Sequence, residues 1–549
     1  MSGKIISVAP SAYSYPLLIK QLLHTPLLQA PQQQIVYRDA RRLTYAELRE
    51  RIGRLASSLA AIGVRPGDTV GVLDWDSNRF LEAFFAIPMM GAVLQTVNVR
   101  LSPEQISYTI NHAGASVLLV NDEFVELVQS IMPQLTGVKK LVVLSDRKTP
   151  APGSLPFVGE YEELLAAAPA DYDFPDFDEN TQATTFYTTG TTGLPKGVYY
   201  SHRQLVLHAM AELALFGLAG RQGRFHRDDV YMPITPMFHV HAWGFPWAAT
   251  LAGAKQVYPG RYDPALLVKL IKTEGVTFTH CVPTILQMLL AAADKAEADL
   301  AGLKMVIGGS ALPKALAKQA LARGIDIFAG YGMSETGPIL TVAHVASSDL
   351  TGDPDQEVEI RTRAGRCCPL VDLRIVSPDM KQMPRDGKTS GEIVARAPWL
   401  TQGYFGNPDA SEQLWAGGYL HTSDIGVMTP DGYLQITDRI KDVIKTGGEW
   451  VSSLELEDII TRHAAVAECA VIGIKDARWG ERPLALVVRR PQGELSEEDV
   501  KAHVMTFCGK GVISKYSVPH KVLFVEALAR TSVGKIDKKV LREKYGDAA

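Results

Sequence analysis

The sequence predicts an α/β protein with a large N-terminal domain of layered α/β sheets, a small β-rich subdomain, and a small mobile C-terminal α+β domain. Residues from about 40 to 300 alternate short β-rich runs with amphipathic helical ones, which is typical of layered, mainly parallel sheets. Past residue 360, short strands are separated by Gly, Pro and Asp. Because 549 residues are too many for one hydrophobic core, we predict two domains, 1–440 and 441–549.

Individual elements follow from capping and periodicity. The helix predicted over Leu43–Gly63 opens with Thr44 as its cap, has Glu47 three residues later, and continues with apolar residues at helical spacing. The acidic residues 171–179 are predicted to connect one unit to the next. The other predicted elements are strands over 68–74 and 115–122, a helix over 77–91, the β-rich strands 373–376, 391–396 and 433–437, and the C-terminal helices 452–463 and 496–508 with strands 468–474, 484–490 and 521–527.

Composition argues against several classes of protein. The net charge of −4 predicts no basic surface for nucleic acid or for an acidic membrane. The five cysteines include no CxxC pair, so we expect neither a disulfide framework nor a zinc site, and a cytoplasmic location fits. No early apolar run has signal-peptide length. A spanning helix needs roughly 20 apolar residues, so the short stretch 83–94, interrupted by Pro88, predicts buried core and no transmembrane segment.

A glycine-rich stretch is the first indication of chemistry. YTTGTTGLPKG (Tyr187–Gly197) combines hydroxyls, a permissive backbone and one lysine, which are groups that hold a phosphate. A P-loop requires glycine before its lysine and a hydroxyl residue after it, whereas Lys196 stands between Pro195 and Gly197. The dinucleotide pattern G-x-G-x-x-G also fails, because GYGMSETG has Glu335 in place of the third glycine. An anion site and a polar surface turn both remain open for this stretch.

Further motifs follow in a fixed order. They are PMFHVHAWG (Pro236–Gly244), VPTILQMLL (Val282–Leu290), GGSAL (Gly308–Leu312), YGMSET (Tyr331–Thr336), TSD (Thr422–Asp424), DRIKDVIKTGGEW (Asp438–Trp450) and TSVGKIDKK (Thr531–Lys539). Together with YTTGTTGLPKGV, they resemble the signatures of acyl-adenylate-forming (AMP-binding) enzymes. This superfamily includes acyl-CoA synthetases, peptide-synthetase adenylation domains and firefly luciferase. The chain looks most similar to bacterial medium- and long-chain fatty acyl-CoA synthetases.

The resemblance implies a reaction in two halves. A carboxylate attacks the α-phosphorus of ATP to give acyl-AMP and pyrophosphate, and the thiol of coenzyme A then takes the acyl group and releases AMP. ATP, Mg²⁺ and coenzyme A are the implied cofactors, with Thr188 and Glu335 as metal ligands. The matching ATP positions are Thr188, Thr189, Gly190, Thr191, Thr192, Gly193, Lys196, Gly309, Ser310, Ala311, Gly330, Tyr331, Gly332, Asp424 and Arg439, and those for coenzyme A are Gly447, Gly448 and Trp450.

The resemblance also implies catalytic and substrate-binding residues. Lys535 is expected to bridge the attacking carboxylate and the α-phosphate, where a positioned cation stabilises developing charge. His239 is expected beside the same carboxylate, and Glu335 at the metal. Lys441 matches the hinge about which the small domain swings between half-reactions. The implied substrate contacts are Trp243, which matches a tryptophan that gates the acyl channel, and Gly309.

Structural roles remain as alternatives. His239 and Trp243 are candidates for ordinary core residues, and Arg439 for a solvated surface arginine. Ser423 stands where the family usually has glycine, which leaves the turn before Asp424 unsettled. Lysines near the C-terminus are expected to be solvated, namely Lys538, Lys539 and Lys544.

The implied function is ATP-dependent activation of a medium- or long-chain fatty acid to acyl-CoA. A CoA ligase for an aryl or short thioether acid is the alternative within the same chemistry. A catalytically silent acyl-adenylate-binding protein is the alternative from another class. The expected partners are therefore a small carboxylic acid, ATP and coenzyme A, with no nucleic acid, and the resemblance leaves room for a homodimer.

Overall fold

The structure is a computed structural model, and it confirms the predicted α/β class. It describes residues 3–146, 155–188, 194–220, 222–446, 449–491, 494–510, 512–531 and 535–546, without the side chains of Pro354, Glu449 and Trp450. The described strands form four sheets, of seven, nine, four and five strands.

The seven-stranded sheet has the order β7-β6-β5-β3-β4-β8-β9, and all its strands are parallel except β9. The predicted capping box of Thr44 and Glu47 begins α2. Every residue of α3 is buried, so the apolar stretch around Pro88 is core, as predicted. The strands are β3 (Thr69–Leu73), β4 (Val93–Thr96), β5 (Ala115–Asn121), β6 (Lys140–Leu144), β7 (Phe157–Glu160), β8 (Gln182–Thr188) and β9 (Lys196–Ser201), and the helices are α1 (His24–Gln29), α2 (Tyr45–Ala61), α3 (Asn78–Met89), α4 (Pro103–Ala113), α5 (Val125–Ile131) and α6 (Tyr161–Ala167).

The nine-stranded sheet has the order β16-β15-β14-β13-β12-β10-β11-β1-β2. Its middle strands are parallel, and antiparallel pairs close both edges. The strands are β1 (Gln34–Tyr37), β2 (Arg41–Thr44), β10 (Val230–Pro233), β11 (Lys255–Tyr258), β12 (Phe278–Cys281), β13 (Lys304–Ile307), β14 (Asp326–Gly332), β15 (Ile339–Val342) and β16 (Arg366–Cys367), and the helices in this part are α7 (His202–Gly217), α8 (Val240–Trp243), α9 (Phe245–Ala252), α10 (Pro264–Glu274), α11 (Pro283–Lys295), α12 (Lys314–Leu321) and α13 (Pro354–Arg361).

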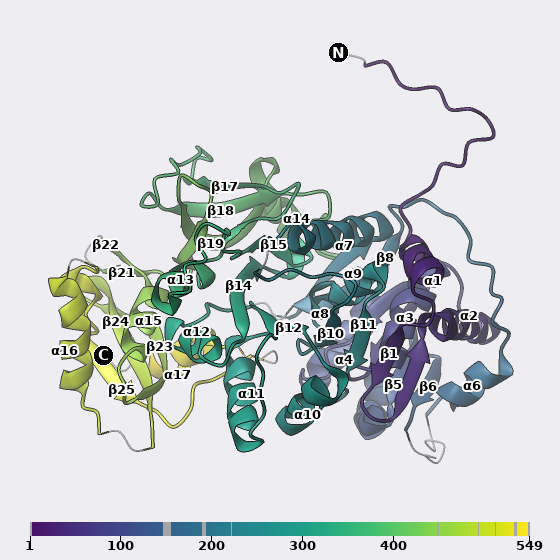
Figure 1. The fold of residues 1–549 in the computed structure, drawn as a ribbon, viewed down its shortest axis with the longest axis horizontal. Helices are drawn as coiled ribbons and strands as arrows, with labels where there is room; N and C mark the ends of the chain where they lie inside the picture. Colours follow the sequence, from purple (N-terminus) through teal and green to yellow (C-terminus); the bar gives the residue numbers. More distant parts are fainter. Residues whose placement is uncertain are drawn as a thin grey trace.

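The β-rich unit is a four-stranded antiparallel sheet, β17-β18-β19-β20, which lies beside the large sheets (Figure 1). Its elements are β17 (Asp372–Val376), β18 (Gly391–Arg396), α14 (Pro408–Leu414), β19 (Leu420–Met428) and β20 (Leu434–Arg439). The largest hydrophobic core runs through these three sheets, from Ile19 to Leu434.

The C-terminal residues form a five-stranded sheet, β22-β21-β24-β23 with β25 beside β24. Two separate hydrophobic clusters, one on each side of this sheet, draw their members from residues 444–541. The boundary at residues 440 and 441 and the mobility of this domain stay predictions. The elements are β21 (Ile444–Thr446), β22 (Glu449–Val451), α15 (Ser453–Thr461), β23 (Val466–Asp476), β24 (Gly480–Arg489), α16 (Glu497–Gly509), β25 (Lys521–Phe524) and α17 (Lys538–Tyr545).

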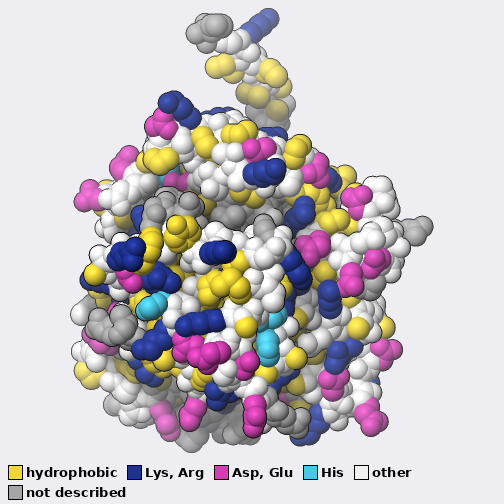
Figure 2. All heavy atoms as spheres, turned by 90° about the vertical axis from the view of Figure 1, so that its left-hand side faces the viewer, with side chains coloured by type: hydrophobic (Ala, Val, Ile, Leu, Met, Phe, Trp, Pro, Cys, Tyr) yellow, Lys and Arg dark blue, Asp and Glu magenta, His cyan; other side chains and the backbone are white. Residues whose placement is uncertain are grey.

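Figure 2 shows the face formed by this end of the molecule, where acidic and basic side chains are interspersed. Within the described part of the chain, no helix combines the length and the apolar character needed to cross a membrane.

Candidate active site

The ends of parallel strands β13 and β14 form one wall of the candidate site. These strands are neighbours, so the glycines that follow β13 and those that end β14 lie side by side. A Cβ atom on Gly308 would lie 3.0 Å from the carbonyl oxygen of Gly330, so glycine is needed for this close approach. Ligands of open α/β sheets bind outside the carboxyl ends of parallel strands, which is where Gly309, Ser310 and Ala311 are placed.

The hairpin of β8 and β9 carries both ends of the glycine-rich stretch. Thr188 pairs with Lys196 at the end of this antiparallel pair where the connecting loop begins and ends. The predicted phosphate-binding residues between them lie outside the described residues, namely Thr189, Gly190, Thr191, Thr192 and Gly193.

Tyr404 joins this hairpin to Glu335. Its hydroxyl donates a hydrogen bond to Oε1 of Glu335 at 2.7 Å, and the ammonium of Lys196 lies 4.5 Å from the centre of its ring. The Tyr404 segment is bound to β9 by a hydrogen bond of 2.8 Å from the Phe405 N–H to the Gly197 carbonyl. Tyr404 was not predicted as a site residue, because nothing in QGYFGNP marks this hydroxyl as facing a carboxylate 69 residues away.

Glu335 is a buried carboxylate in a cationic setting. It is 6% exposed, and burial raises its pKa above the usual range, although the Tyr404 hydrogen bond and the nearby Lys196 and Lys535 oppose the shift. The 3-10 turn that holds it, Ser334–Thr336, is fixed by a hydrogen bond of 3.1 Å from the Thr401 N–H to the Glu335 carbonyl. A desolvated carboxylate of this kind gains from any additional positive charge.

Asp424 lies on β19 opposite Arg439 on β20. Its Oδ2 accepts a hydrogen bond from the Tyr331 hydroxyl at 2.8 Å, and its Oδ1 lies 3.1 Å from Nε of Arg439. Arg439 is therefore ion-paired, with its side chain 48% exposed. Ser423 has a φ of 59°, the left-handed region that favours glycine, so the serine accepts the conformation at that position with some strain.

Lys535 enters this group from the C-terminal domain. Its Cε lies 2.9 Å from the position that a Cβ atom on Gly309 would occupy. Burial and the neighbouring Arg439 lower the pKa of Lys535 to about 8, while Asp424 and Glu335 favour its charged form. Residues from four separate motifs thus meet around one lysine.

Arg530 fastens the Lys535 loop to the large domain. Its Nη1 donates a hydrogen bond to Oγ1 of Thr284 at 2.7 Å, and its Nη2 pairs with Glu468 at 2.8 Å. Thr284 belongs to α11 and Glu468 to β23, so one guanidinium bridges the two domains. This contact was not predicted, since an arginine five residues before Lys535 carries no distinguishing pattern.

His239 begins a strained turn. The four residues after it, Val240–Trp243, all have positive φ values, between 47° and 61°, and Gly244 continues the turn at 83°. Burial lowers the pKa of His239 to about 3, with smaller effects from Lys535 and Arg100, so its imidazole is neutral at ordinary pH. A left-handed run of non-glycine residues costs roughly 1–2 kcal/mol per residue, and such strain is found at functional sites.

Trp243 is the last of the four non-glycine residues with positive φ in this turn. It is 6% exposed, and its ring stacks on His280 with centroids 4.8 Å apart. The Cη2 atom of its indole lies 2.9 Å from where a Cβ on Gly308 would be. Trp243 therefore lies against Gly308, and Lys535 lies against the next residue, Gly309.

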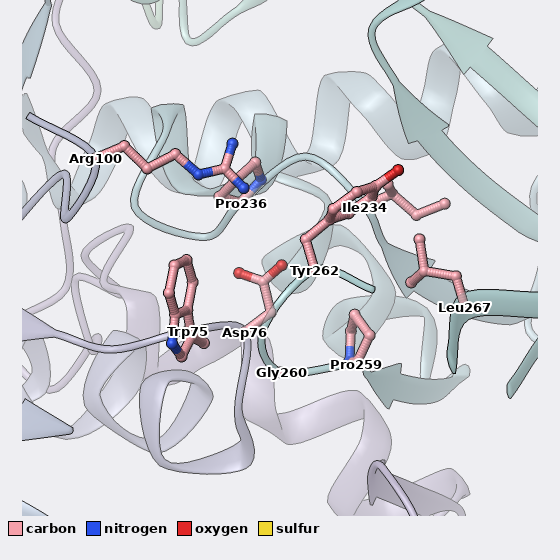
Figure 3. A pocket seen from close by; sticks show the side chains of 9 residues that line it. All are labelled: Trp75, Asp76, Arg100, Ile234, Pro236, Pro259, Gly260, Tyr262 and Leu267. Carbon is pink, nitrogen blue, oxygen red and sulfur yellow. The ribbon is translucent and has the colours of Figure 1, made fainter. Parts of the chain in front are cut away.

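A small pocket of 10 Å³ is lined in part by the loop that leads to His239 (Figure 3). Asp76 and Arg100 both line it, together with Trp75 and Pro236. Oδ1 of Asp76 accepts a hydrogen bond of 2.7 Å from the Met237 N–H, which anchors the loop two residues before His239. Neither Asp76 nor Arg100 was identified from the sequence.

The predicted hinge region lies in a turn after β20. Lys441 is exposed, and its role as the hinge stays a prediction. Asp438, near the end of β20, accepts a hydrogen bond of 2.5 Å from the N–H of Ser453, the first residue of α15. Gly447 and Gly448 lie outside the described residues, as does the side chain of Trp450.

One expectation for the C-terminal lysines is wrong. Lys538 is only 10% exposed, and its ammonium pairs with Glu457 at 2.7 Å and donates to the Ser453 hydroxyl at 2.7 Å. It is buried because α17 packs against β23 of its own domain, so the cation needs these oxygen partners. Lys539 and Lys544 are exposed, as expected.

These motifs and this fold define an adenylate-forming enzyme, and comparison with known proteins agrees. The chain belongs to the AMP-binding enzyme family, whose main domain matches residues 25–405 and whose C-terminal domain matches residues 455–535. It is an AMP-forming acid–CoA ligase, which binds ATP and joins a carboxylic acid to coenzyme A.

Individual relatives support this assignment along nearly the whole chain. A long-chain-fatty-acid–CoA ligase of Thermus thermophilus is 43% identical, over 92% of this chain and 91% of its own. A 3-methylmercaptopropionyl-CoA ligase of Ruegeria lacuscaerulensis is 39% identical, over 97% of this chain and 98% of its own. The crystal structure of ATP-bound MatB from Rhodopseudomonas palustris superposes with a TM-score of 0.81 at 26% identity, covering 96% of this chain and 99% of that one.

Proposed function

We propose that the protein activates a medium- or long-chain fatty acid to acyl-AMP and transfers the acyl group to coenzyme A. The observation that carries the proposal is the position of Lys535 against Gly309, where the carboxylates of Asp424 and Glu335 favour its charged form. The similarity to a long-chain-fatty-acid–CoA ligase supports a fatty acid as substrate. We place the reaction in the cytoplasm, and pairing of two copies stays a prediction.

Lys535 acts in the first half-reaction. An oxygen of the substrate carboxylate attacks the α-phosphorus, and the bond to the bridging oxygen breaks so that pyrophosphate leaves with its electron pair. The Lys535 ammonium faces both reactants and stabilises the charge that develops on the phosphoryl oxygens. His239, which is neutral, provides a hydrogen-bonding ring nitrogen beside the attacking carboxylate without repelling Lys535.

The nucleotide is held by the surrounding motifs. The hairpin loop with Thr188 and Lys196 contacts the β- and γ-phosphates, and Gly309–Ala311 with Gly330–Gly332 form the adenine slot. Asp424 accepts the ribose hydroxyls, because a carboxylate has lone pairs beyond those used by Tyr331 and Arg439.

Glu335 fits a magnesium ion bound with ATP. Mg²⁺ is typically held by one or two carboxylates together with phosphate oxygens and water, so a single buried carboxylate is a suitable donor. Among the described residues, no cluster of three His, Cys, Asp or Glu side chains offers a fuller cage. Glu335 and the Thr188 hydroxyl would hold the ion, which would neutralise phosphate charge.

The second half-reaction needs a different arrangement of the small domain. The thiol sulfur of coenzyme A attacks the acyl carbonyl carbon, loses its proton to solvent, and AMP leaves. We assign the hinge to Lys441, and the approach of the thiol to the glycines Gly447 and Gly448 with Trp450.

The pKa of Lys535 predicts how adenylation depends on pH. A lysine is cationic below its pKa, so with a pKa of about 8 the free enzyme loses this cation as the pH rises through 8. We expect kcat/KM for ATP to fall above that pH, while kcat changes less, because bound phosphate favours the protonated form. Pyrophosphate release across pH measures both values. The Lys535→Arg variant is the control, since a guanidinium keeps its proton, and a wild-type profile as flat as that of this variant would contradict the assignment.

Replacing Trp243 by alanine tests the gate. If the indole closes the acyl channel until ATP binds, acid binding in Trp243→Ala should no longer respond to a non-hydrolysable ATP analogue, while the melting temperature stays close to that of the wild type. A purely structural tryptophan would instead cost about 3–5 kcal/mol of stability when truncated. Acid titrations with and without the analogue, and thermal melts of the same sample, separate the two outcomes. Unchanged nucleotide dependence with a large loss of stability would refute the gate.

A panel of carboxylic acids tests the substrate class. AMP release that requires both ATP and coenzyme A should be fastest with medium- or long-chain fatty acids. A second candidate is a short thioether acid, which is favoured by the similarity to the 3-methylmercaptopropionyl-CoA ligase. Aryl acids belong in the same panel. Binding of acyl-AMP without turnover of any acid would identify a silent adenylate-binding protein.

A further inference from the structure

A buried chain of hydrogen bonds joins the end of β20 to α17, the helix that follows Lys535. The Lys538 ammonium donates to Oγ of Ser453 at 2.7 Å, and this hydroxyl donates to Oδ1 of Asp438 at 3.0 Å. The Ser453 N–H donates to Oδ2 of Asp438 at 2.5 Å. Asp438 and Ser453 are at most 1% exposed, so water competes little for these bonds, which are strong in such surroundings. We call Asp438, Ser453 and Lys538 the Asp438 relay.

The cation of the relay is fixed within the C-terminal domain. Lys538 also pairs with Glu457 at 2.7 Å, and Glu457 accepts a hydrogen bond of 2.8 Å from the Val471 N–H on β23. Burial raises the pKa of Asp438 above its usual range, and the Lys538 ammonium opposes this shift. The lysine and the aspartate therefore stabilise each other's charge, although Asp438 lies before the predicted domain boundary and Lys538 after it.

The position of Lys538 limits the position of Lys535. The two are three residues apart, and three residues span at most about 11 Å. The backbone between them is also tied to the strand before the loop, because the Asp537 N–H donates to the Ala529 carbonyl at 2.8 Å and the Thr531 N–H donates to the Lys535 carbonyl at 2.7 Å. The loop and the start of α17 thus form one unit, so a contact that holds Lys538 also holds the backbone of Lys535.

The relay crosses the predicted hinge. Asp438 precedes Lys441 and Ser453 follows it, so a rotation about Lys441 moves the two partners relative to each other. Successive side chains of a strand point to opposite faces, and the next residue of β20, Arg439, pairs with Asp424 at 3.1 Å. The end of β20 therefore holds the small domain through one residue and contributes to the candidate site through the next.

We propose that Asp438 is a positioning residue that holds the small domain in the adenylating arrangement and acts on Lys535 through Ser453 and Lys538. This inference rests on the proposed function and on the hinge assigned there. While the relay is closed, the Lys535 ammonium stays at the glycine wall of the site. When the small domain turns for thioester formation, the bonds from Ser453 to Asp438 break and water takes the place of Ser453. Asp438 therefore favours the first half-reaction and does not contribute to the second.

The test measures pyrophosphate release and thioester formation from supplied acyl-AMP in single turnovers of the full-length protein. Asp438→Ala removes both acceptor oxygens, so we expect acyl-AMP formation to slow by at least about 10-fold, since a reacting group misplaced by about 1 Å can cost about 100-fold. Thioester formation should be unchanged or faster. Ser453→Ala keeps the N–H bond to Asp438 and removes only the hydroxyl, so it should slow the first step by a smaller factor, about 5-fold, and spare the second.

Asp229→Ala is the matched control. Asp229 is also buried, and it accepts from the same three kinds of donor, namely the His226 N–H at 2.8 Å, the Thr277 hydroxyl at 2.7 Å and the Lys304 ammonium. All four residues belong to the large domain, so none of these contacts crosses the hinge. This variant should have a lower melting temperature and an unchanged ratio of the two rates.

An unchanged ratio of the two rates in folded Asp438→Ala would overturn the inference, whether both steps slowed alike or neither did. If that variant does not fold, the same ratio in Ser453→Ala decides, because this change removes a single hydroxyl. Either result leaves the proposed function intact, since the wild-type enzyme still forms acyl-AMP and the thioester. Failure of the wild-type enzyme to form acyl-AMP from any acid would instead refute the proposed function.

Discussion

Replacing Lys535 by alanine is expected to slow acyl-AMP formation by roughly 10²–10³-fold or more, while coenzyme A still takes the acyl group from supplied acyl-AMP at close to the wild-type rate. The reason is the place of the ammonium beside Gly309, where no other described lysine touches the glycine wall. Removing it leaves the charge that develops on the phosphoryl oxygens without its nearest cation, but leaves the thiol transfer chemically unchanged.

Pyrophosphate release measures the first half-reaction, and thioester formation from synthetic acyl-AMP measures the second. Lys539→Ala is the matched control, since this lysine is four residues away and exposed. It should leave both rates unchanged. Equal loss of both half-reactions in Lys535→Ala would indicate misfolding or a different role for the lysine.

The change of Lys441 to proline should have the opposite pattern, with adenylation largely retained and thioester formation slowed on the order of 10²-fold, as misplaced reacting groups usually are. Proline fixes φ near −65° and restricts the residue before it, so the turn after β20 could no longer take up a second set of backbone angles. Lys441 is exposed, and none of the contacts around Lys535 depends on its side chain.

Single-turnover measurements of adenylation and of thioester formation test whether Lys441 is the hinge. Lys441→Ala serves as the control, because it removes the same side chain but leaves the backbone free, and it should support both steps. If the proline variant slowed both steps alike, the pivot would lie elsewhere in the chain.

The sequence predicted the fold class and the motifs around the site, because both depend on local patterns. The capping pattern of Thr44 and Glu47 indicates a helix start from local sequence alone, and YGMSET and TSVGK can be recognised without knowledge of what they touch. The prediction for Lys538 failed for the complementary reason. Whether a lysine is solvated or paired depends on what packs against its helix, and Glu457 is 81 residues away.

The residues that were missed are those whose role arises from pairing across the chain. Tyr404 meets Glu335 because its segment joins the edge of β9, and β1 enters the nine-stranded sheet beside β11, whose residues are more than 200 positions later. Neither of these two pairings can be predicted from the local periodicity of the sequence.

The bridge made by Arg530 has a kinetic consequence. If the small domain turns between the half-reactions, the hydrogen bond to Thr284 must break in every catalytic cycle, while the pair with Glu468 travels with the domain. A hydrogen bond to a charged group contributes about 1.5–3 kcal/mol, which corresponds to a lifetime longer by roughly one to two powers of ten. The strength of this hydrogen bond would therefore help to determine how long the adenylating arrangement lasts. It would last long enough for pyrophosphate to leave, but breaking the bond need not limit turnover.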